Sequence, residues 1–262
     1  MKKILAVVLM FVLAISLVAC GGSGTTVSND TDSVDSGIAA EAAEAKKVEE
    51  KISSMGEISI DNIEKINEAK KTYESLSSGA KSKVSNYEIL QNALTQIEPL
   101  KEEKINQLLS TMHYDEDRVQ NMKFYTPKVI KYYDSDTWAA DIRCFVVPYI
   151  GMDDSSCWLR LLYNYTSDDW VFFKKVTFAI DGERYYESFN YFDIVHDNEG
   201  GDVWEYIDVE VSESDIELLK KIANSTETIV RFEGDDYSYD FTIPEADKQA
   251  IRDVITVYEL KQ

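Results

Sequence analysis

The chain has 262 residues and a formal net charge of −21 at pH 7, from 27 basic and 48 acidic side chains. Nucleic-acid binding depends on Lys and Arg side chains that neutralise phosphates, so a chain this acidic is not expected to bind nucleic acid. The negative net charge would also be repelled by an anionic lipid surface, so electrostatic attraction is not expected to hold the chain there. The two histidines, His113 and His196, form no HxxxH pattern and no CxxC motif is present, so no metal site and no cofactor are predicted.

The first twenty residues have the layout of a secretory signal. Lys2 and Lys3 precede an uncharged apolar run of sixteen residues, Ile4–Ala19. This run is short for a membrane span, which needs about twenty apolar residues. It ends at Cys20, and a run of Gly and Ser follows at once. The alternative is an uncleaved N-terminal helix whose end contains a cysteine, because a short span can be accommodated where the bilayer thins.

The sequence Leu17-Val18-Ala19-Cys20 resembles the lipobox of bacterial lipoproteins. The resemblance implies that residues 1–19 are a lipoprotein signal peptide and that Cys20 carries lipid on its sulfur. It also implies attachment to the extracytoplasmic face of a cell membrane, in a Gram-positive bacterium. Loss of residues 1–19 removes two lysines and no acid, which changes the charge from −21 to −23. Residues 20–38 are then the lipidated cysteine and a flexible linker, because their Gly, Ser, Thr and Asp bury little apolar surface.

Residues 39–112 are predicted to form a small helical bundle or hairpin. A first helix over 39–54, rich in Ala, Glu and Lys, is followed by Gly56, a typical C-cap residue. Asp61 is the expected N-cap of a second helix that stops at residues 77–79, and Asn86 is the expected N-cap of a third. Pro99 is expected to kink or break this third helix.

The apolar stripe of the third helix resumes at Ile105 and continues through Leu108 to Met112. A unit of about seventy residues is only marginally stable alone. We therefore expect the last helix to dock on the following domain or to run into it.

Residues 48–97 resemble small helical modules of large Gram-positive surface proteins, similar to FIVAR-type repeats. The resemblance rests on three patterns in this segment: Ile52-x-x-Met55-Gly56, Ile66-x-x-Ala69-x-x-x-Tyr73 and Lys81-x-x-Val84-x-Asn86. Met55 departs from the usual Ile, and the module stands alone instead of in tandem. Such modules serve as spacers or binding modules, so the resemblance implies no catalytic residue here.

Residues 113–262 are predicted to form an antiparallel domain, which gives the chain an α+β fold. Of thirty aromatic residues, only Phe11, Tyr73 and Tyr87 precede His113, and aromatic residues favour strands. Strands are predicted near residues 125–133, 138–149, 157–166, 171–181, 184–192, 203–211, 227–233 and 237–243. Two helices are predicted, one between 211 and 227 and one at the C-terminus.

Local signals fix the boundaries of several of these elements. Asp181-Gly182 is a hairpin turn signal, and residues 233–236 are a second. Ser212 and Asp215 resemble a capping box before the first helix, and Pro244 precedes the last. The stretch from residue 171 to 248 resembles a domain of uncharacterised lipoproteins and membrane proteins of Firmicutes. The resemblance spans most of residues 113–262 and implies a fold and no known activity.

Cys144 and Cys157 are a candidate disulfide, because such bonds persist outside the cytoplasm. They would face each other if the hairpin turned near Ile150–Gly151. The loop over 150–156 also permits other registers, in which both residues are free thiols, as buried cysteines often are.

Three sets of residues are candidates for chemistry. His196 and Asp197 could be a base and its orienting acid, or simply surface polar residues. Paired Asp residues at predicted turns could bind Ca²⁺, but turn Asp usually bonds its own backbone. The aromatic excess could be a stacking platform for glycan or peptide, or core packing of the sheet. The acidic pairs and the tryptophans are Asp134/Asp136, Asp153/Asp154, Asp168/Asp169, Asp235/Asp236, Trp138, Trp158, Trp170 and Trp204.

No P-loop, dinucleotide fingerprint, GxSxG or HExxH motif is present, so no catalytic residue is assigned and enzymatic activity is left open. The leading hypothesis is a lipid-anchored, extracytoplasmic binding or scaffold protein of the cell envelope. It would be held to the membrane through Cys20 and contact an envelope protein, peptide or glycan. The alternative is an envelope hydrolase that acts on glycan or peptide through carboxylates. A solute-binding lipoprotein is a third hypothesis. The sequence argues against it, because it lacks the alternation of strands and helices that forms the two lobes of such proteins.

Overall fold

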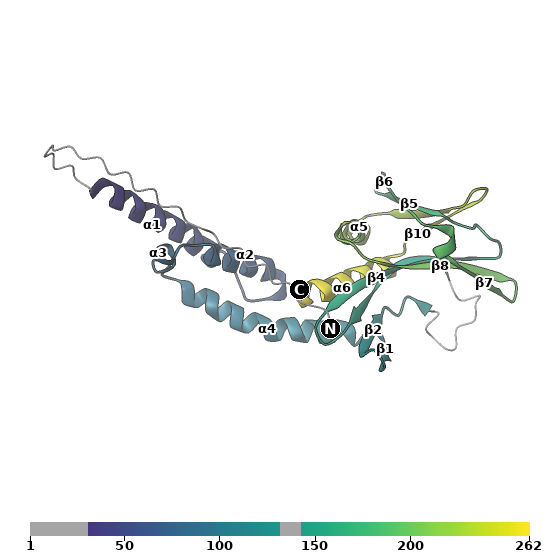
Figure 1. Ribbon diagram of the computed structural model, residues 1–262, viewed down its shortest axis with the longest axis horizontal. Helices are drawn as coiled ribbons and strands as arrows, with labels where there is room; N and C mark the ends of the chain where they lie inside the picture. The colour runs from purple at the N-terminus through teal and green to yellow at the C-terminus, as the bar shows by residue number, and fades with distance from the viewer. Residues whose placement is uncertain (1–30, 132–142) are drawn as a thin grey trace, which may run out of the picture.

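The computed structural model of the protein describes residues 31–131 and 143–262. The predictions for the signal, Cys20, Asp134, Asp136 and Trp138 therefore lie outside the described residues. The described chain has helices and antiparallel sheets, which confirms the predicted α+β class. Figure 1 shows an elongated helical unit that extends away from a sheet domain. We use these two names for residues 31–109 and for the described part of 113–262.

The helical unit contains four α-helices and one short 3-10 helix within the described residues. They are α1 (Thr31–Ser53), η1 (Ile60–Asn62), α2 (Ile63–Glu74), α3 (Ser78–Lys81) and α4 (Tyr87–Leu109). Helix α1 begins inside the linker predicted over 20–38, so residues 31–38 are helical. Adding residues to a helix that the following Ala- and Glu-rich run has nucleated requires little further free energy. The linker prediction was wrong for this part.

Two further details of the helical unit differ from the sequence prediction. Asp61 lies in η1, and the N-cap of α2 is Asn62, so the predicted cap was one residue early. Helix α4 runs without interruption through Pro99, so the predicted break was wrong. Proline lacks the N–H that would bond the carbonyl four residues earlier. Buried side chains hold the helix on both sides of this defect, with Ile97 before it and Ile105 after it.

An aliphatic core joins the helices of this unit. It includes Val48 and Ile52 of α1, Ile66 of α2, and Leu90 and Ile97 of α4, all at most 2% exposed. The side chain of Asn86, at the N-cap of α4, donates to the Glu49 carbonyl of α1 and so fixes the turn before α4 against that helix.

The strands of the sheet domain form a six-stranded sheet and a four-stranded sheet within the described residues. The order is β1-β2-β3-β4-β8-β7 in the first and β10-β9-β5-β6 in the second, and every pair is antiparallel. The strands are β1 (His113–Asp117), β2 (Met122–Thr126), β3 (Phe145–Met152), β4 (Cys157–Ser167), β5 (Lys175–Ile180), β6 (Glu183–Ser188), β7 (Val195–Glu199), β8 (Asp202–Glu210), β9 (Thr228–Glu233) and β10 (Ser238–Thr242).

The described residues of the domain also form the 3-10 helix η4 (Tyr191–Asp193) and the α-helices α5 (Glu213–Asn224) and α6 (Glu245–Lys261). Ser212 and Asp215 form the predicted capping box of α5, in which each side chain bonds the other residue's backbone N–H. Both sheets and both α-helices share one core. Its members include Tyr163 of β4, Phe178 of β5 and Phe232 of β9, which are at most 1% exposed.

The two short strands β1 and β7 were not predicted. Both lie at the edges of the six-stranded sheet, and both consist largely of acidic and polar residues. Such residues have low strand propensity and are also typical of protected edge strands. Strand β2 ends at Thr126, so the strand predicted over 125–133 was displaced toward the C-terminus.

A third cluster of buried side chains joins the helical unit to the sheet domain. We call it the joint cluster; its buried members are Ile105, Leu108, Met112, Ile150, Met152, Leu159, Val254, Val257 and Leu260. They come from α4, β3, β4 and α6, and Met112 from the turn after α4, so the last turns of α4 dock on the sheet domain as expected. The joint is therefore made by apolar packing, which resists independent motion of the two parts more than a flexible linker would.

Candidate functional site

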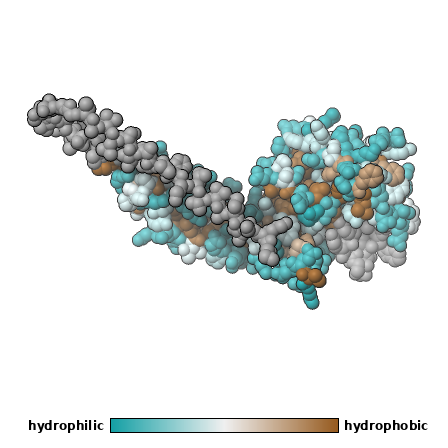
Figure 2. Space-filling view, viewed as in Figure 1, coloured by the Kyte–Doolittle hydropathy of each residue, from teal (hydrophilic) through white to brown (hydrophobic). Residues whose placement is uncertain are grey.

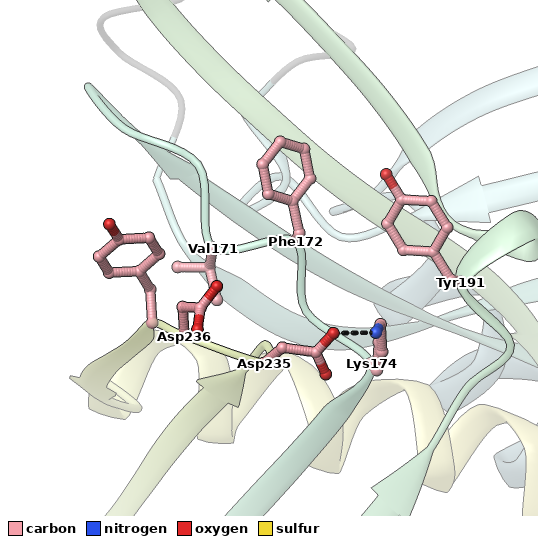
Figure 3. Close-up of a pocket in the computed structure, with 7 residues that line it drawn as sticks. Val171, Phe172, Lys174, Tyr191, Asp235 and Asp236 are labelled. Carbon is pink, nitrogen blue, oxygen red and sulfur yellow. Dashed lines mark hydrogen bonds and ion pairs between the residues drawn. The ribbon is translucent and has the colours of Figure 1, made fainter.

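The candidate site is a groove at one end of the four-stranded sheet, with a volume of about 370 Å³. We call it the aromatic groove; it is lined by Val171, Phe172, Lys174, Tyr191, Asp235, Asp236 and Tyr237. Three segments supply these residues: the loop over 168–174, the 3-10 helix η4 and the β9–β10 turn over 234–237. Figure 3 shows the rings of Phe172 and Tyr191 on one side of the groove and the ion pair of Lys174 with Asp235 below them.

A buried carboxylate shapes the loop that carries Phe172. Glu205, on β8, is 0% exposed and accepts backbone N–H bonds from Val171, Phe172 and Phe173 at 2.7–2.8 Å. Three N–H donors compensate the cost of removing a carboxylate from water. Phe172 has a φ of +52°, a conformation that a residue with a side chain rarely adopts. The residue is 42% exposed, so the strained loop presents part of an apolar side chain to solvent.

The opposite wall of the groove is the turn over 234–237. Gly234 donates to the Tyr237 carbonyl, and Lys174 donates its backbone N–H to the Glu233 carbonyl, both at 2.9 Å. A Cβ at position 234 would lie 2.0 Å from the Val171 carbonyl oxygen, so only glycine allows this close approach. The turn was predicted from the sequence, but its contact with the 168–174 loop was not.

The charges of the groove are unequal in number. Lys174 pairs with Asp235 and also lies 5.9 Å from the centre of the Tyr191 ring. Asp236 has neither a hydrogen bond nor an ion pair with any described residue. The groove residues therefore carry two acids and one base, a net charge of −1. Tyr237 is 65% exposed, which leaves a second ring beside the unpaired acid.

Aromatic rings support the groove from behind. Trp170 stacks on Phe172 with ring centres 5.2 Å apart, and Tyr191 lies 4.8 Å from the ring of His196. Of the candidate tryptophans in the described residues, Trp170 is the one whose ring contacts a ring of the groove. Trp158 instead packs over Gly151, and Trp204 lies on β8 next to Glu205, on the opposite face of the sheet.

Asp197 does not orient His196, so the two residues do not form the predicted pair of base and orienting acid. The two residues are neighbours on β7 and point to opposite faces, with Asp197 exposed. The Nε2 atom of His196 lies 3.8 Å from Oε2 of Glu205 and has no hydrogen-bond partner. The acid beside His196 is thus Glu205, whose carboxylate already accepts three backbone hydrogen bonds.

Cys144 and Cys157 are free thiols, so the candidate disulfide was wrong. Strands β3 and β4 pair Met152 with Cys157, which places the two cysteines at opposite ends of the hairpin, about 25–30 Å apart. The hairpin turns at Asp153, whose carboxylate accepts from the backbone of Ser155 and Ser156. Burial raises the pKa of each thiol to about 11.

The acidic turns behave as ordinary turns within the described residues. Hydrogen bonds from Ser155 and Ser156 lower the pKa of Asp153 to about 2, and Asp169 accepts from the backbone N–H of Trp170. Across residues 31–131 and 143–262, no group of three His, Cys, Asp or Glu side chains is placed to hold a metal ion.

Among the described residues, two carboxyl groups have a raised pKa, the property expected of a catalytic acid. Burial raises the pKa of Asp247 although Arg143 binds it through two hydrogen bonds, at 2.5 and 2.8 Å. Burial and the nearby Asp215 raise the pKa of Glu187. Neither group lines the aromatic groove, so the structure does not bring a tuned acid to the candidate site.

Sequence reasoning missed Glu205 and Lys174, which organise the groove. A signal for Glu205 exists in β8, where it alternates in phase with the inward-facing Val203 and Ile207. An acid at such a position must have a partner inside the fold. The partners are backbone N–H groups about thirty residues away in sequence, and no local pattern identifies them.

Comparison with known proteins finds no matching family model, no matching curated protein and no matching solved structure. In the described part of the chain, none of the helices combines the length and the apolar character that crossing a membrane requires.

Proposed function

We propose that the protein is a lipid-anchored, extracytoplasmic binding protein of the cell envelope. In this proposal Cys20 carries the lipid, the helical unit is a spacer, and the aromatic groove receives the ligand. The observation that carries the binding role is Phe172: a residue with positive φ keeps a large apolar ring partly in solvent, in a groove that exposed Tyr237 also lines. Strain of this kind persists only when the surrounding structure imposes it, and it gathers at ligand sites.

The shape of the molecule supports the spacer role. Helix α1 begins at the end of the helical unit that is farthest from the sheet domain (Figure 1). Helices α1 and α4 each have 23 residues, a length of about 35 Å. An anchor that precedes α1 would thus hold the sheet domain at a distance from the membrane.

Two experiments test the proposal. Metabolic labelling with palmitate is expected to label the wild-type protein and not Cys20→Ala; equal labelling of both would refute the anchor. For the binding role, protein immobilised from residue 31 onward is exposed to envelope extract, alongside Phe172→Ser. We expect the wild type to retain an envelope component that Phe172→Ser retains much less. Equal retention by the two proteins would show that the groove does not bind the envelope component.

A further inference from the structure

Strand β10 is the edge strand with the fewest charged side chains. Within the described residues the two sheets end in four edge strands: β1, β6, β7 and β10. Charged side chains and prolines on an edge strand keep a protein from pairing with another chain. Strands β1 and β6 each contain three residues that are Asp, Glu, Lys or Arg, and β7 contains two, whereas β10 contains one, Asp240. By this measure β10 is the least protected of the four edges.

The one acid of β10 already has a partner. The carboxylate of Asp240 accepts two hydrogen bonds from the Arg231 guanidinium, both at 2.6 Å, and Arg231 lies directly opposite on β9. These bonds lower the pKa of Asp240. Because a cation of the same sheet matches this charge, the acid adds little repulsion against an approaching strand.

The hydrogen bonds at the two ends of the β9–β10 hairpin fix the direction of its backbone groups. Gly234 donates to the Tyr237 carbonyl at one end, and Ile243 donates to the Thr228 carbonyl at the other, both at 2.9 Å. The strands keep one register between these ends, and bonded and non-bonded pairs alternate along an antiparallel ladder. Every second residue of β10 is therefore bonded to β9.

The remaining residues of β10, Ser238, Asp240 and Thr242, direct their backbone N–H and C=O groups away from β9. All three residues are exposed, and no described strand pairs with this side of β10. A row of donors and acceptors at this spacing is satisfied by an extended backbone, as in proteins that add a peptide to the edge of a sheet.

The core-facing side of the four-stranded sheet is incompletely covered at β10. Val230 and Phe232 of β9 are 0% exposed, whereas Tyr239 of β10 is 39% exposed. Its ring centre lies 5.4 Å from that of Tyr165 on β4, so this side chain belongs to the side that faces the other sheet. A further strand would cover the exposed part of Tyr239 with the side chains of every second residue. Apolar residues suit those positions.

We propose that β10 pairs with an extended peptide segment of a partner protein, in which apolar and basic residues alternate. The β9–β10 hairpin, residues 228–242, contains four acids and one base, a net charge of −3, which favours a basic segment. A second copy of this chain is disfavoured as the occupant, because each copy has a formal net charge of −21. No residue of β10 lines the aromatic groove, so this inference goes beyond the proposed function and does not depend on it.

The probe is a capped octapeptide of alternating valine and lysine, added to the full-length protein in a non-ionic detergent. Fluorescence anisotropy of the labelled probe measures binding, and hydrogen exchange followed by mass spectrometry locates it. We expect saturable binding and slower exchange over residues 238–242. A peptide with glutamate in place of each lysine should bind more weakly by about tenfold or more. Equal binding of the two peptides would overturn the basic character of the partner.

Ser238→Pro tests the edge itself. The Ser238 N–H points away from β9, and an edge strand tolerates proline at such a position, above all at its first residue. Thermal unfolding should match that of the wild type, and binding of the lysine probe should weaken by about tenfold or more, because a donor is lost and the ring blocks the edge. The exchange map of the wild type tests the same edge without any substitution.

Ser188→Pro is the matched control, at the last residue of edge strand β6 in the same sheet. Phe189 donates to the Lys174 carbonyl in the β5–β6 register, so the N–H of Ser188 also points away from its partner strand. This variant should bind the lysine probe as the wild type does.

The other outcomes overturn the proposal. Equal binding by the wild type and Ser238→Pro, or slower exchange in β6 instead of β10, would show that the peptide does not pair with β10. A dimer of the protein alone in sedimentation velocity, abolished by Ser238→Pro, would make the occupant a second copy. Binding of neither peptide would reject the peptide partner. The envelope-capture experiment with Phe172→Ser would still decide the function of the groove separately.

Discussion

The helical unit and the sheet domain differ in the side chains that they bury. The core of the helical unit is made of aliphatic side chains and small residues, such as Val48, Ile66 and Ala69. Its charged residues stay at the surface, where pairs such as Lys83 with Glu41 contribute little. Among its described residues, only glycine has a positive φ. These properties are sufficient for a stiff spacer.

The sheet domain buries charged side chains and supplies a partner to each. Glu205 is matched by three backbone N–H groups, Asp247 by Arg143, and Lys248 by the carbonyls of Ser225 and Thr226. The strained non-glycine residues among those described all lie in this domain, at positions 121, 172 and 181. On the face shown in Figure 2, hydrophobic side chains of the sheet domain reach the surface among hydrophilic ones. We therefore assign the proposed binding role to the sheet domain.

The largest effect is expected from Glu205→Ala. The substitution leaves three buried N–H groups without an acceptor and opens a cavity, which should lower the free energy of unfolding by about 3–5 kcal/mol. Urea unfolding at pH 7 measures the loss. Glu210→Gln, at the exposed end of the same strand, is the control and should change the stability by less than about 0.5 kcal/mol. Equal effects of the two substitutions would show that Glu205 does not organise the loop.

Two substitutions on α4 sharpen the boundary between the regions. Ile105→Ala opens a cavity in the joint cluster, and Ile97→Ala opens one in the core of the helical unit, each at a cost of about 2–4 kcal/mol. Hydrogen exchange distinguishes them. Ile105→Ala should increase exchange in α6 as well as in α4, whereas Ile97→Ala should leave α6 protected. Unchanged α6 protection in both would mean that the units are not coupled through this packing.

Gly234→Ala tests the close contact between the two walls of the groove. Its Cβ would lie 2.0 Å from the Val171 carbonyl oxygen, so the backbone must shift, with a loss of about 1–3 kcal/mol. Thermal unfolding measures this loss. Gly37→Ala in α1 is the matched control: its Cβ meets nothing within 4 Å, and it should stabilise the helix by about 0.5–1 kcal/mol. A Gly234→Ala protein as stable as the wild type would contradict the contact.

The smallest effect is a pH dependence at the β3–β4 turn. Hydrogen bonds from Ser155 and Ser156 lower the pKa of Asp153 from 3.8 to about 2. A lowered pKa in the folded state means that these bonds stabilise the protein above about pH 4 and are lost as the pH falls toward 2. The stability difference between wild type and Asp153→Asn should therefore shrink over this range in urea unfolding. A difference that is constant with pH would show that the carboxylate is not selectively stabilised.

The sequence predicted those features whose cause is local. The capping box of Ser212 and Asp215, the Asp181-Gly182 turn and the stripe from Ile105 to Met112 depend on residues a few positions apart. The α+β class followed from the unequal distribution of aromatic residues along the chain. Edge strands β1 and β7 were missed because partner strands, not their own residues, make them extended.

The candidate site was predictable only in part. The aromatic excess and the turn at residues 233–236 were recognised, and both contribute to the groove. Their position relative to each other depends on Glu205, whose partners are distant in sequence, and on a clearance that only Gly234 provides. The state of the two cysteines stayed open in the sequence because the loop over 150–156 permits several hairpin registers, and the hydrogen bonds of the Asp153 side chain fix one of them.

Site-specific photo-cross-linking in intact cells tests most directly whether binding belongs to the sheet domain. A benzophenone amino acid replaces Tyr237 in the aromatic groove in one protein, and Ile89 of the helical unit in another. Both side chains are more than half exposed, so neither replacement disturbs a core. We expect a cross-linked envelope component from position 237 that is absent at position 89. Cross-linking at position 89 with none at position 237 would contradict the assignment and give the binding role to the helical unit.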